Sequence, residues 1–378
     1  MTQIHGTVDP AFEAVRAAFE ANFEQHGDVG ASVCVQIAGE TVVDLWGGTA
    51  TFDDGERPWE RDTIINVWST TKTMSFLCCL LLADRGELDL DAPVATYWPE
   101  FAAGGKEQVA TRHIMGHTAG LSGWDEPLDV TDLLDHDKLV GLHAAQAPWW
   151  EPGSASGYHA ISQGYLLGEI VKRVDGRSLG TFFAEEIAGP LGADFHIGTE
   201  AEHDARVAHV IPPTENLLGD DEISRDSLRF RSLENPALAA SYSSTVGWRR
   251  AESPAAGGHG NARSVATIHS LTANGGAGII SPDGLERIFE EQANGIDLVM
   301  DQELRLGMGF GLASPMMPLP NDRCCFWAGW GGSLAIIDMA NKMSFSYAMN
   351  KMGDDLATDP RGPGLLLTTY ASLGLAPG

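Results

Sequence analysis

The chain has 378 residues, 43% of them hydrophobic and 20% charged, which is the balance of a soluble globular protein large enough for two structural lobes. Its 24 basic residues stand against 52 acidic ones, a formal net charge of −28 without a basic cluster, so nucleic acid and anionic lipid are excluded as partners. The first twenty residues lack a basic start followed by an apolar run, and no segment approaches about 20 uninterrupted apolar residues. We therefore expect a soluble cytoplasmic protein that does not contact membranes.

The five cysteines are odd in number and include two adjacent pairs, Cys78-Cys79 and Cys324-Cys325. This arrangement suits neither a disulfide framework nor a zinc site, so it predicts reduced cysteines in the core. His113 and His117 lie four residues apart, but no Glu follows His113 and no third ligand is evident. We expect neither a bound metal ion nor any other cofactor.

The first ninety residues predict a helix, a hairpin and a second helix. Apolar residues recur every three or four positions from Pro10 to about Gln25, as in an amphipathic helix. The strand-like runs SVCVQI and TVVDLW follow, separated by Ala38-Gly39-Glu40, which is typical of a hairpin. The segment STTKTMSFLCCLLLADR, residues 69–85, is apolar on all sides and is followed by Gly86, so it predicts a buried helix.

The rest of the chain divides into a helical middle and a strand-rich end. Helical patterns cover residues 131–145, 162–174 and 262–272, without a regular alternation of strands and helices. From about residue 325 the runs SLAIID and MSFSYAM predict strands, and residues 363–372 predict a last helix. The expected fold is α+β, with one antiparallel sheet built from residues 1–90 and 301–378 and flanked by helices. Residues 91–300 would form a mainly helical inserted lobe, with the active site between the two lobes.

The sequence Ser69-Thr70-Thr71-Lys72, at the start of the apolar helix, is the first candidate for chemistry. Burial of an ammonium group is costly, so the pKa of Lys72 should fall and favour the neutral amine, which can accept a proton. Positions i and i+3 share a helix face, so Ser69 and Lys72 should be neighbours. The helix start also places the Ser69 N–H where it can stabilise developing negative charge. The alternative is that Ser69 is an N-cap and that Lys72 extends into solvent.

The run INVWSTTKTMSFLCCLLLADRGELDLDAPVATYWPEF, followed by TRHIMGHTAGL, resembles the serine β-lactamase and penicillin-binding protein superfamily. Within that superfamily the chain looks most like the class C β-lactamase-like esterases, often called family VIII carboxylesterases. The resemblance extends from the hairpin before Ser69 to the strands after Trp327. It implies a β-lactamase/transpeptidase-like fold and an acyl-enzyme on the serine. No Gly-x-Ser-x-Gly elbow occurs, which argues against an α/β-hydrolase.

A second family motif, Tyr-x-Asn, matches Tyr158-His159-Ala160 in the segment EPGSASGYHAISQGYLLGEIV. The resemblance implies that Tyr158 shares a proton network with the serine and the lysine. Ala160 replaces the family's Asn, so a side chain that would hydrogen-bond an acyl amide is missing. His159 is close enough in sequence to reach the substrate, although a solvent-facing loop histidine is the preferred interpretation.

The third family motif, Lys-Thr-Gly, matches Trp327-Ala328-Gly329, a Trp-x-Gly form that esterases of this family show. The resemblance implies that the backbone N–H of Trp330 is the second oxyanion donor beside the N–H of Ser69. Trp327 cannot bind the carboxylate that β-lactams and peptide C-termini carry, and it offers an apolar wall instead. Neutral esters therefore fit better. The alternative is that Trp327 and Trp330 are core aromatics.

Together these motifs predict a serine carboxylesterase that hydrolyses small or short-chain esters through an acyl-enzyme on Ser69. Lys72 and Tyr158 would move the protons, and the sequence leaves open which of them is the base in each step. The residues expected to line the substrate site are His159, Ala160 and Trp327-Ala328-Gly329. A β-lactamase, a D-amino-acid peptidase or an acyltransferase of the same fold is the first alternative, and a non-catalytic binding protein of that fold is the second. The oligomeric state stays open.

Overall fold

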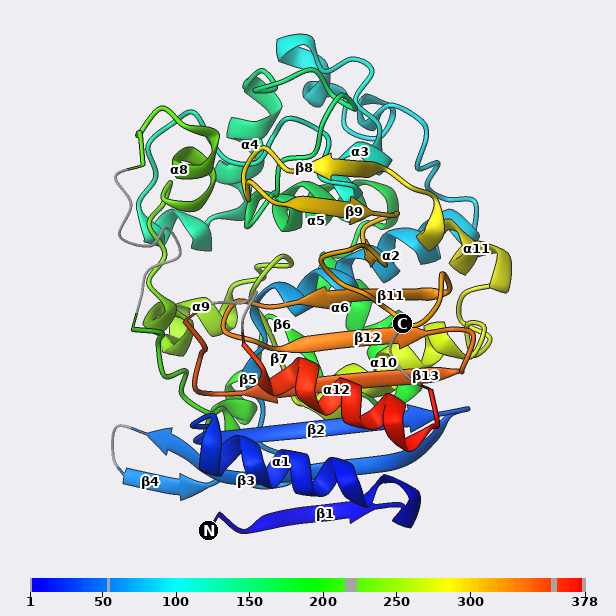
Figure 1. Ribbon diagram of the computed structural model, residues 1–378. Coiled ribbons are helices and arrows are strands. Elements are labelled where there is room, and N and C mark those ends of the chain that lie inside the picture. Colours follow the sequence, from blue (N-terminus) through cyan, green and yellow to red (C-terminus); the bar gives the residue numbers. More distant parts are fainter. Residues whose placement is uncertain (1, 53–54, 215–222, 355–358, 376–378) are drawn as a thin grey trace.

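The framework of the molecule is one large antiparallel sheet (Figure 1), seen in a computed structural model that describes residues 2–52, 55–214, 223–354 and 359–375. Ten of the described strands join it, nine of them in the order β1-β3-β2-β13-β12-β11-β10-β9-β8, with β4 paired to β3. These strands are β1 (Ile4–Val8), β2 (Gly30–Ile37), β3 (Glu40–Phe52), β4 (Gly55–Pro58), β8 (Ala293–Ile296), β9 (Glu303–Leu306), β10 (Gly311–Leu312), β11 (Cys324–Ala328), β12 (Leu334–Asp338) and β13 (Met343–Met349). Strands from both ends of the chain therefore meet where β2 pairs with β13.

The predicted hairpin forms at the predicted turn. Ile37 of β2 pairs with Glu40 of β3, and the two residues between them, Ala38 and Gly39, have φ angles of 51° and 87°. A two-residue turn with both residues left-handed matches the right-handed twist of the strands that it joins. The strands at the centre of the sheet, β12 and β13, are buried at every position. Helices must therefore cover both faces of the sheet.

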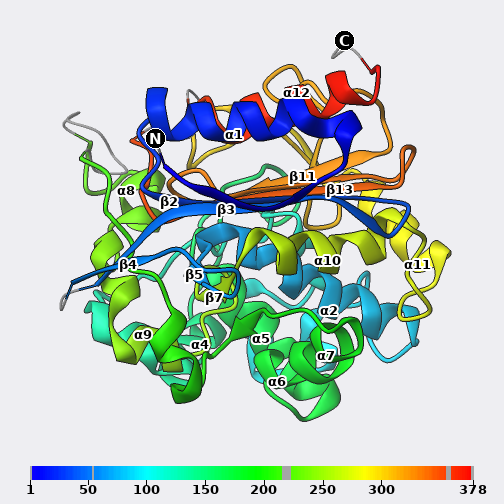
Figure 2. The same cartoon turned by 90° about the horizontal axis from the view of Figure 1, so that it is seen from below.

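Figure 2 shows these two covering layers. The helices α1 (Glu13–Gln25) and α12 (Arg361–Ser372) lie side by side on one face, and α10 (Ala262–Ala273) lies on the other, against β2, β12 and β13. Phe19 of α1 and Tyr370 of α12 are buried in the core that these two helices form with the sheet. The helix α2 (Lys72–Asp84) lies between the sheet and α5 (Ser162–Asp175) (Figure 1). Its residues 72–82 are all buried, as its uniformly apolar sequence predicts.

The other elements surround α2 and α5. A second sheet has the order β5-β7-β6 and consists of β5 (Ile65–Asn66), β6 (His196–Ile197) and β7 (Gly258–Gly260). The remaining α-helices are α3 (Thr111–Met115), α4 (His136–Ala145), α6 (Leu179–Phe183), α7 (Gly189–Leu191), α8 (Leu228–Leu233), α9 (Val246–Arg250) and α11 (Pro282–Glu286). Shorter helical segments are η1 (Pro10–Phe12), η2 (Trp68–Thr71), η3 (Val94–Thr96), η4 (Pro99–Gly105), η5 (Val130–Leu134), η6 (Ala184–Ala188), η7 (Ala201–Arg206), η8 (Ala240–Ser244) and η9 (Arg287–Phe289).

The predicted α+β fold is confirmed, with local differences. The pattern over 131–145 is divided at Asp135, whose non-helical backbone ends η5 and whose side chain accepts a hydrogen bond from the Lys138 N–H at the start of α4. The division of the chain into two lobes stays a prediction. Two elements from residues 91–300 belong with the large sheet: α10 packs against its face, and β8 is one of its strands.

The cysteines and the long helices fit a protein with an ordinary buried core. All five cysteines are buried and free, as predicted. Within the described ranges, no helix combines the length and the apolar character needed to cross a bilayer.

Candidate active site

Ser69 lies in η2, the single turn that leads directly into α2. The predicted helix start at Ser69 is therefore a 3₁₀ turn, and the α-helix itself begins at Lys72. Trp68, immediately before the serine, has a φ angle of 49°, an uncommon conformation for a residue with a side chain. This turn leaves Ser69 partly exposed, although Trp68 and Thr70 on either side are buried.

Lys72 is fully buried and its Nζ lies 3.1 Å from Ser69 Oγ. Its other two contacts are backbone carbonyl oxygens, Ala160 O at 2.7 Å and Ala255 O at 3.0 Å. Burial lowers the pKa of Lys72 well below its usual value of 10.5. A neutral amine has two N–H groups for the two carbonyls and one lone pair for the serine hydroxyl. The surroundings of Lys72 therefore suit a proton acceptor, and the alternative of a lysine that extends into solvent is wrong.

Tyr158 is the second polar side chain that contacts Ser69, after Lys72. Its hydroxyl donates a hydrogen bond to Ser69 Oγ at 2.8 Å, and its ring centroid lies 5.0 Å from Lys72 Nζ. Burial raises the pKa of Tyr158 to about 12, so the phenol keeps its proton at neutral pH. Hydrogen bonds can thus run from Tyr158 O–H to Ser69 Oγ and from Ser69 O–H to Lys72 Nζ. The structure brings the three predicted catalytic residues together.

His159 lies next to this group but points away from solvent. Its ring is fully buried, with Nδ1 donating to Gly157 O at 2.7 Å and Nε2 accepting from the Leu121 N–H at 3.2 Å. Burial lowers its pKa to about 3, so the ring is neutral. The prediction of a solvent-facing histidine is wrong, because the segment around Leu121 encloses the ring. These two bonds to the backbone give no support to a substrate contact.

Ala160 contributes a backbone atom where its family motif has a side chain. Its carbonyl oxygen accepts the hydrogen bond from Lys72 Nζ, and its own N–H donates to Tyr158 O at 3.1 Å. Although Ala160 lacks the side chain of the family's Asn, its carbonyl oxygen still gives Lys72 a hydrogen-bond partner.

The turn between β11 and β12 packs against η2, the segment that contains Ser69. Ser333 Oγ donates to Val67 O at 2.8 Å and lies 2.9 Å from Thr70 Oγ1, so the turn is fastened to η2 on both sides of the serine. A Cβ atom added at Gly329 would lie 2.2 Å from Val67 O and 3.3 Å from Ser69 N. Gly329 thus lies with its backbone close to the serine N–H. The role of the Ser69 and Trp330 N–H groups as oxyanion donors stays a prediction.

Trp327 belongs to the core more than to the open surface. Its ring is 7% exposed and stacks on the His117 ring with the centroids 5.5 Å apart and the planes at 15°. It also meets Phe76 edge to face at 5.7 Å and lies 6.2 Å from the Tyr158 ring. Trp327 therefore offers a substrate little of the apolar surface that was expected of it. Trp330 is more exposed, and its ring packs on that of Trp68 at 4.9 Å.

Comparisons with known proteins show the family of this chain. The Beta-lactamase family model matches residues 15–367. This chain belongs to the beta-lactamase family. The esterase/beta-lactamase LipL of Mycobacterium tuberculosis is 34% identical in an alignment 376 residues long that covers 95% of this chain and 86% of LipL.

Two crystal structures are similar over almost the full length of this beta-lactamase family member. A family VIII carboxylesterase has a TM-score of 0.91 and 41% identity, covering 98% of this chain and 100% of that chain. A penicillin-binding protein homolog from Caulobacter crescentus has a TM-score of 0.89 and 38% identity, with the same coverage. The predicted resemblance is confirmed, and the chain is a serine hydrolase of the beta-lactamase fold.

The fit between Gly329 and η2 leads to a prediction for this beta-lactamase family member. Gly329→Ala should lower kcat about 10²-fold, because the new methyl group must push the turn away from Ser69. Steady-state kinetics with p-nitrophenyl acetate and the melting temperature test this. Gly364→Ala in α12 is the control, since its Cβ would have open space around it. A Gly329→Ala enzyme with kcat within twofold of the parent would contradict the fit.

Some groups that contact the candidate catalytic residues, or the residues on either side of Ser69, carry no sequence signal. Ala255 acts through its carbonyl oxygen, which every residue has, and Ser333 lies four residues beyond the matched glycine. Asp297, whose carboxylate meets the Tyr158 N–H at 3.0 Å, looks in the sequence like any turn aspartate. Within the described part of the chain, no group of three or more His, Cys, Asp or Glu side chains is placed to hold a metal ion.

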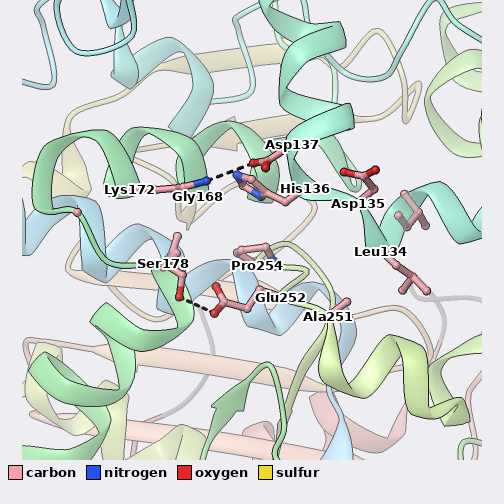
Figure 3. Close-up of a pocket in the computed structure, with 13 residues that line it drawn as sticks. Leu134, Asp135, His136, Asp137, Gly168, Lys172, Ser178, Ala251, Glu252 and Pro254 are labelled. Carbon is pink, nitrogen blue, oxygen red and sulfur yellow. Dashed lines mark hydrogen bonds and ion pairs between the residues drawn. The ribbon is translucent and has the colours of Figure 1, made fainter.

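A cavity of about 500 Å³ lies away from Ser69, beside α4 and α5 (Figure 3). Two of its charged side chains, Asp137 and Lys172, pair with each other at 3.2 Å, and Glu252 accepts a hydrogen bond from Ser178 at 2.6 Å. Because these groups already satisfy one another, the cavity offers no evident polar site for a ligand.

Proposed function

We propose that the protein is a carboxylesterase that hydrolyses small, uncharged esters through an acyl-enzyme on Ser69. The single observation that carries this proposal is the placement of Lys72 Nζ at 3.1 Å and Tyr158 Oη at 2.8 Å from Ser69 Oγ. One neighbour is suited to accept a proton and the other to donate one. That pair of roles is what acyl transfer through a serine requires.

In the acylation step, Ser69 Oγ attacks the carbonyl carbon of the ester and its proton passes to Lys72 Nζ. The carbonyl oxygen becomes an oxyanion that the N–H groups of Ser69 and Trp330 stabilise. When the bond to the alcohol breaks, the leaving oxygen takes a proton from Tyr158, which regains one from the protonated Lys72. The products are the free alcohol and the acylated serine, with Lys72 neutral again.

In the deacylation step, a water molecule attacks the acyl carbonyl carbon. The pair of Lys72 and Tyr158 takes up the water proton, and the same two N–H groups hold the second oxyanion. Collapse of this intermediate releases the carboxylic acid and returns a proton to Ser69 Oγ. No cofactor takes part in either step.

The charges around the site support an uncharged substrate. Arg361 donates to Gly331 O in the β11–β12 turn at 3.1 Å, but its guanidinium is buried and paired with Asp28 at 2.8 Å and Asp359 at 2.6 Å. Its charge is therefore already matched and is not available for a substrate carboxylate. Trp330, partly exposed beside Ser69, presents an aromatic ring. An ester with a short acyl chain or a small aryl group fits these surroundings.

Hydrolysis of β-lactams is the second candidate, because LipL carries both activities in its name. Turnover of p-nitrophenyl acetate and butyrate compared with nitrocefin separates the two. We expect kcat/KM for the esters to exceed that for nitrocefin by about 10²-fold or more, because Arg361 beside the β11–β12 turn is already paired with two carboxylates and does not serve the β-lactam carboxylate. Efficient nitrocefin turnover with negligible ester cleavage would overturn the choice of substrate. Absence of both activities, and of labelling by a serine-directed phosphonate, would favour a non-catalytic binding protein.

A further inference from the structure

Asp297 connects a distant turn to the candidate active site. It follows β8, its side chain is fully buried, and its Oδ1 accepts hydrogen bonds from the N–H groups of Val299 and Met300, both at 2.9 Å. These two bonds form an ordinary aspartate turn. The same oxygen also accepts a hydrogen bond from the Tyr158 N–H at 3.0 Å, across 139 residues of sequence. The turn is therefore attached to the residue proposed to move protons.

The backbone around Tyr158 is held from two sides. On one side the Leu298 N–H donates to Ser156 O at 2.8 Å, beside the bond from Tyr158 to Asp297. On the other side His117 O accepts from the Gly157 N–H at 2.9 Å, and His117 Nδ1 accepts from the His159 N–H at 3.0 Å. A phenol that must stay within hydrogen-bond distance of a nucleophile benefits from such a fixed backbone.

The hydrogen bonds that Asp297 accepts do not by themselves require a negatively charged side chain. Oδ1 makes all three hydrogen bonds, whereas Oδ2 is closed to solvent and has no partner among the described residues. An asparagine could offer the same Oδ1 acceptor without burying a charge. An unpaired buried carboxylate oxygen costs stability, so a purely structural role does not account for it.

We propose that Asp297 is a positioning residue whose buried carboxylate fixes the backbone of Tyr158 and thereby holds the phenol at Ser69, with its negative charge acting on that phenol. The inference rests on the proposed role of Tyr158 in proton transfer. The charge of Asp297 adds to burial in raising the pKa of Tyr158. Lys72, on α2, and His117, after α3, also face the Tyr158 ring, each at 5.0 Å. Burial favours the neutral form of both, so among the described residues Asp297 is the group whose charge helps to raise the pKa of Tyr158.

Asp297→Asn tests the charge without removing the acceptor. We expect Tyr158 to ionise roughly half a pH unit lower in this variant, because a nearby negative charge has been removed. Stopped-flow pH jumps followed by tyrosinate absorbance measure the ionisation. The signal of Tyr158 is isolated by subtracting that of the matching protein with Tyr158→Phe. Asp301→Asn is the matched control, since Asp301 is exposed on the same turn and should leave the midpoint unchanged.

Asp297→Ala tests the positioning by removing the acceptor as well. We expect kcat for p-nitrophenyl acetate to fall about 10- to 100-fold with little change in KM, because the Tyr158 hydroxyl loses its fixed place. Coinciding ionisation midpoints for Asp297→Asn and Asp301→Asn would overturn the proposal, and so would a kcat for Asp297→Ala within twofold of the parent. The ionisation measurement needs no substrate, so it separates a failure of this inference from a failure of the proposed esterase function.

Discussion

Ser69→Ala is expected to lower kcat for p-nitrophenyl acetate by about 10³-fold or more, because in the proposed mechanism the bond to the acyl group forms at Ser69 Oγ and no other atom replaces it. The fold should persist. Alanine at this position removes one hydroxyl, whose neighbours are Lys72 Nζ and Tyr158 Oη. The melting temperature should therefore stay close to that of the parent protein. Labelling with a fluorophosphonate, followed by peptide mass spectrometry, should modify Ser69 in the parent and nothing in the variant.

A serine elsewhere in the chain provides the control for this experiment. Ser372→Ala removes a hydroxyl from α12 that bonds only to the carbonyl oxygen of Thr368 at 2.9 Å in the described structure, and it should leave kcat unchanged. An enzyme with Ser69→Ala that still cleaves the ester at a substantial fraction of the parent rate would refute the acyl-enzyme on Ser69.

Lys72→Arg is expected to lower kcat about 10²- to 10⁴-fold, the range that general base catalysis contributes. The guanidinium of arginine stays charged at every accessible pH and has no lone pair for the serine proton. In the parent, burial lowers the pKa of Lys72, and the proposed mechanism uses the neutral amine. Activity should therefore rise with pH through that lowered pKa and then level off. In the variant this rise should disappear, since no lysine remains to lose its proton.

Two further variants make the result for Lys72 specific. Lys72→Met keeps a long side chain without charge or base, so it should lose activity to a similar extent. Lys172→Arg on the surface of α5, where the lysine is 47% exposed, should have no effect. Full activity with Lys72→Met, or an unchanged pH profile with Lys72→Arg, would move the role of base to Tyr158.

The sequence predicted the central strands and the buried helix that carries Lys72 for identifiable physical reasons, whereas Tyr158 was predicted by the family resemblance. Alternation in SLAIID and MSFSYAM and the two-residue turn at Ala38-Gly39 are local signals that tertiary packing did not override. The burial of Lys72 followed from the apolar residues on every side of its helix. The short strands β8, β9 and β10 were missed, because ANGI, ELRL and GL have no strong strand pattern of their own.

The details that the sequence could not predict depend on contacts between distant segments. His159 is buried because residues from the Leu121 segment close over it, which no local pattern indicates. Ala160 and Ala255 hold Lys72 by carbonyl oxygens, and backbone atoms have no residue identity to recognise. Trp327 was expected as a wall of the substrate site, but stacking on His117 places most of its ring in the core.

The turn between β11 and β12 has a consequence for synthesis of the protein on the ribosome. A nascent chain that has passed Tyr158 already contains Ser69 and Lys72, yet the turn that fastens to Val67 through Ser333 has not been made. The strand β2 likewise cannot pair until β13 has been synthesised, and most of the chain lies between the two strands. Pairings so distant in sequence form late in folding. We therefore expect the proposed hydrolysis to require a chain that extends through β13, and partial products of translation to be inactive.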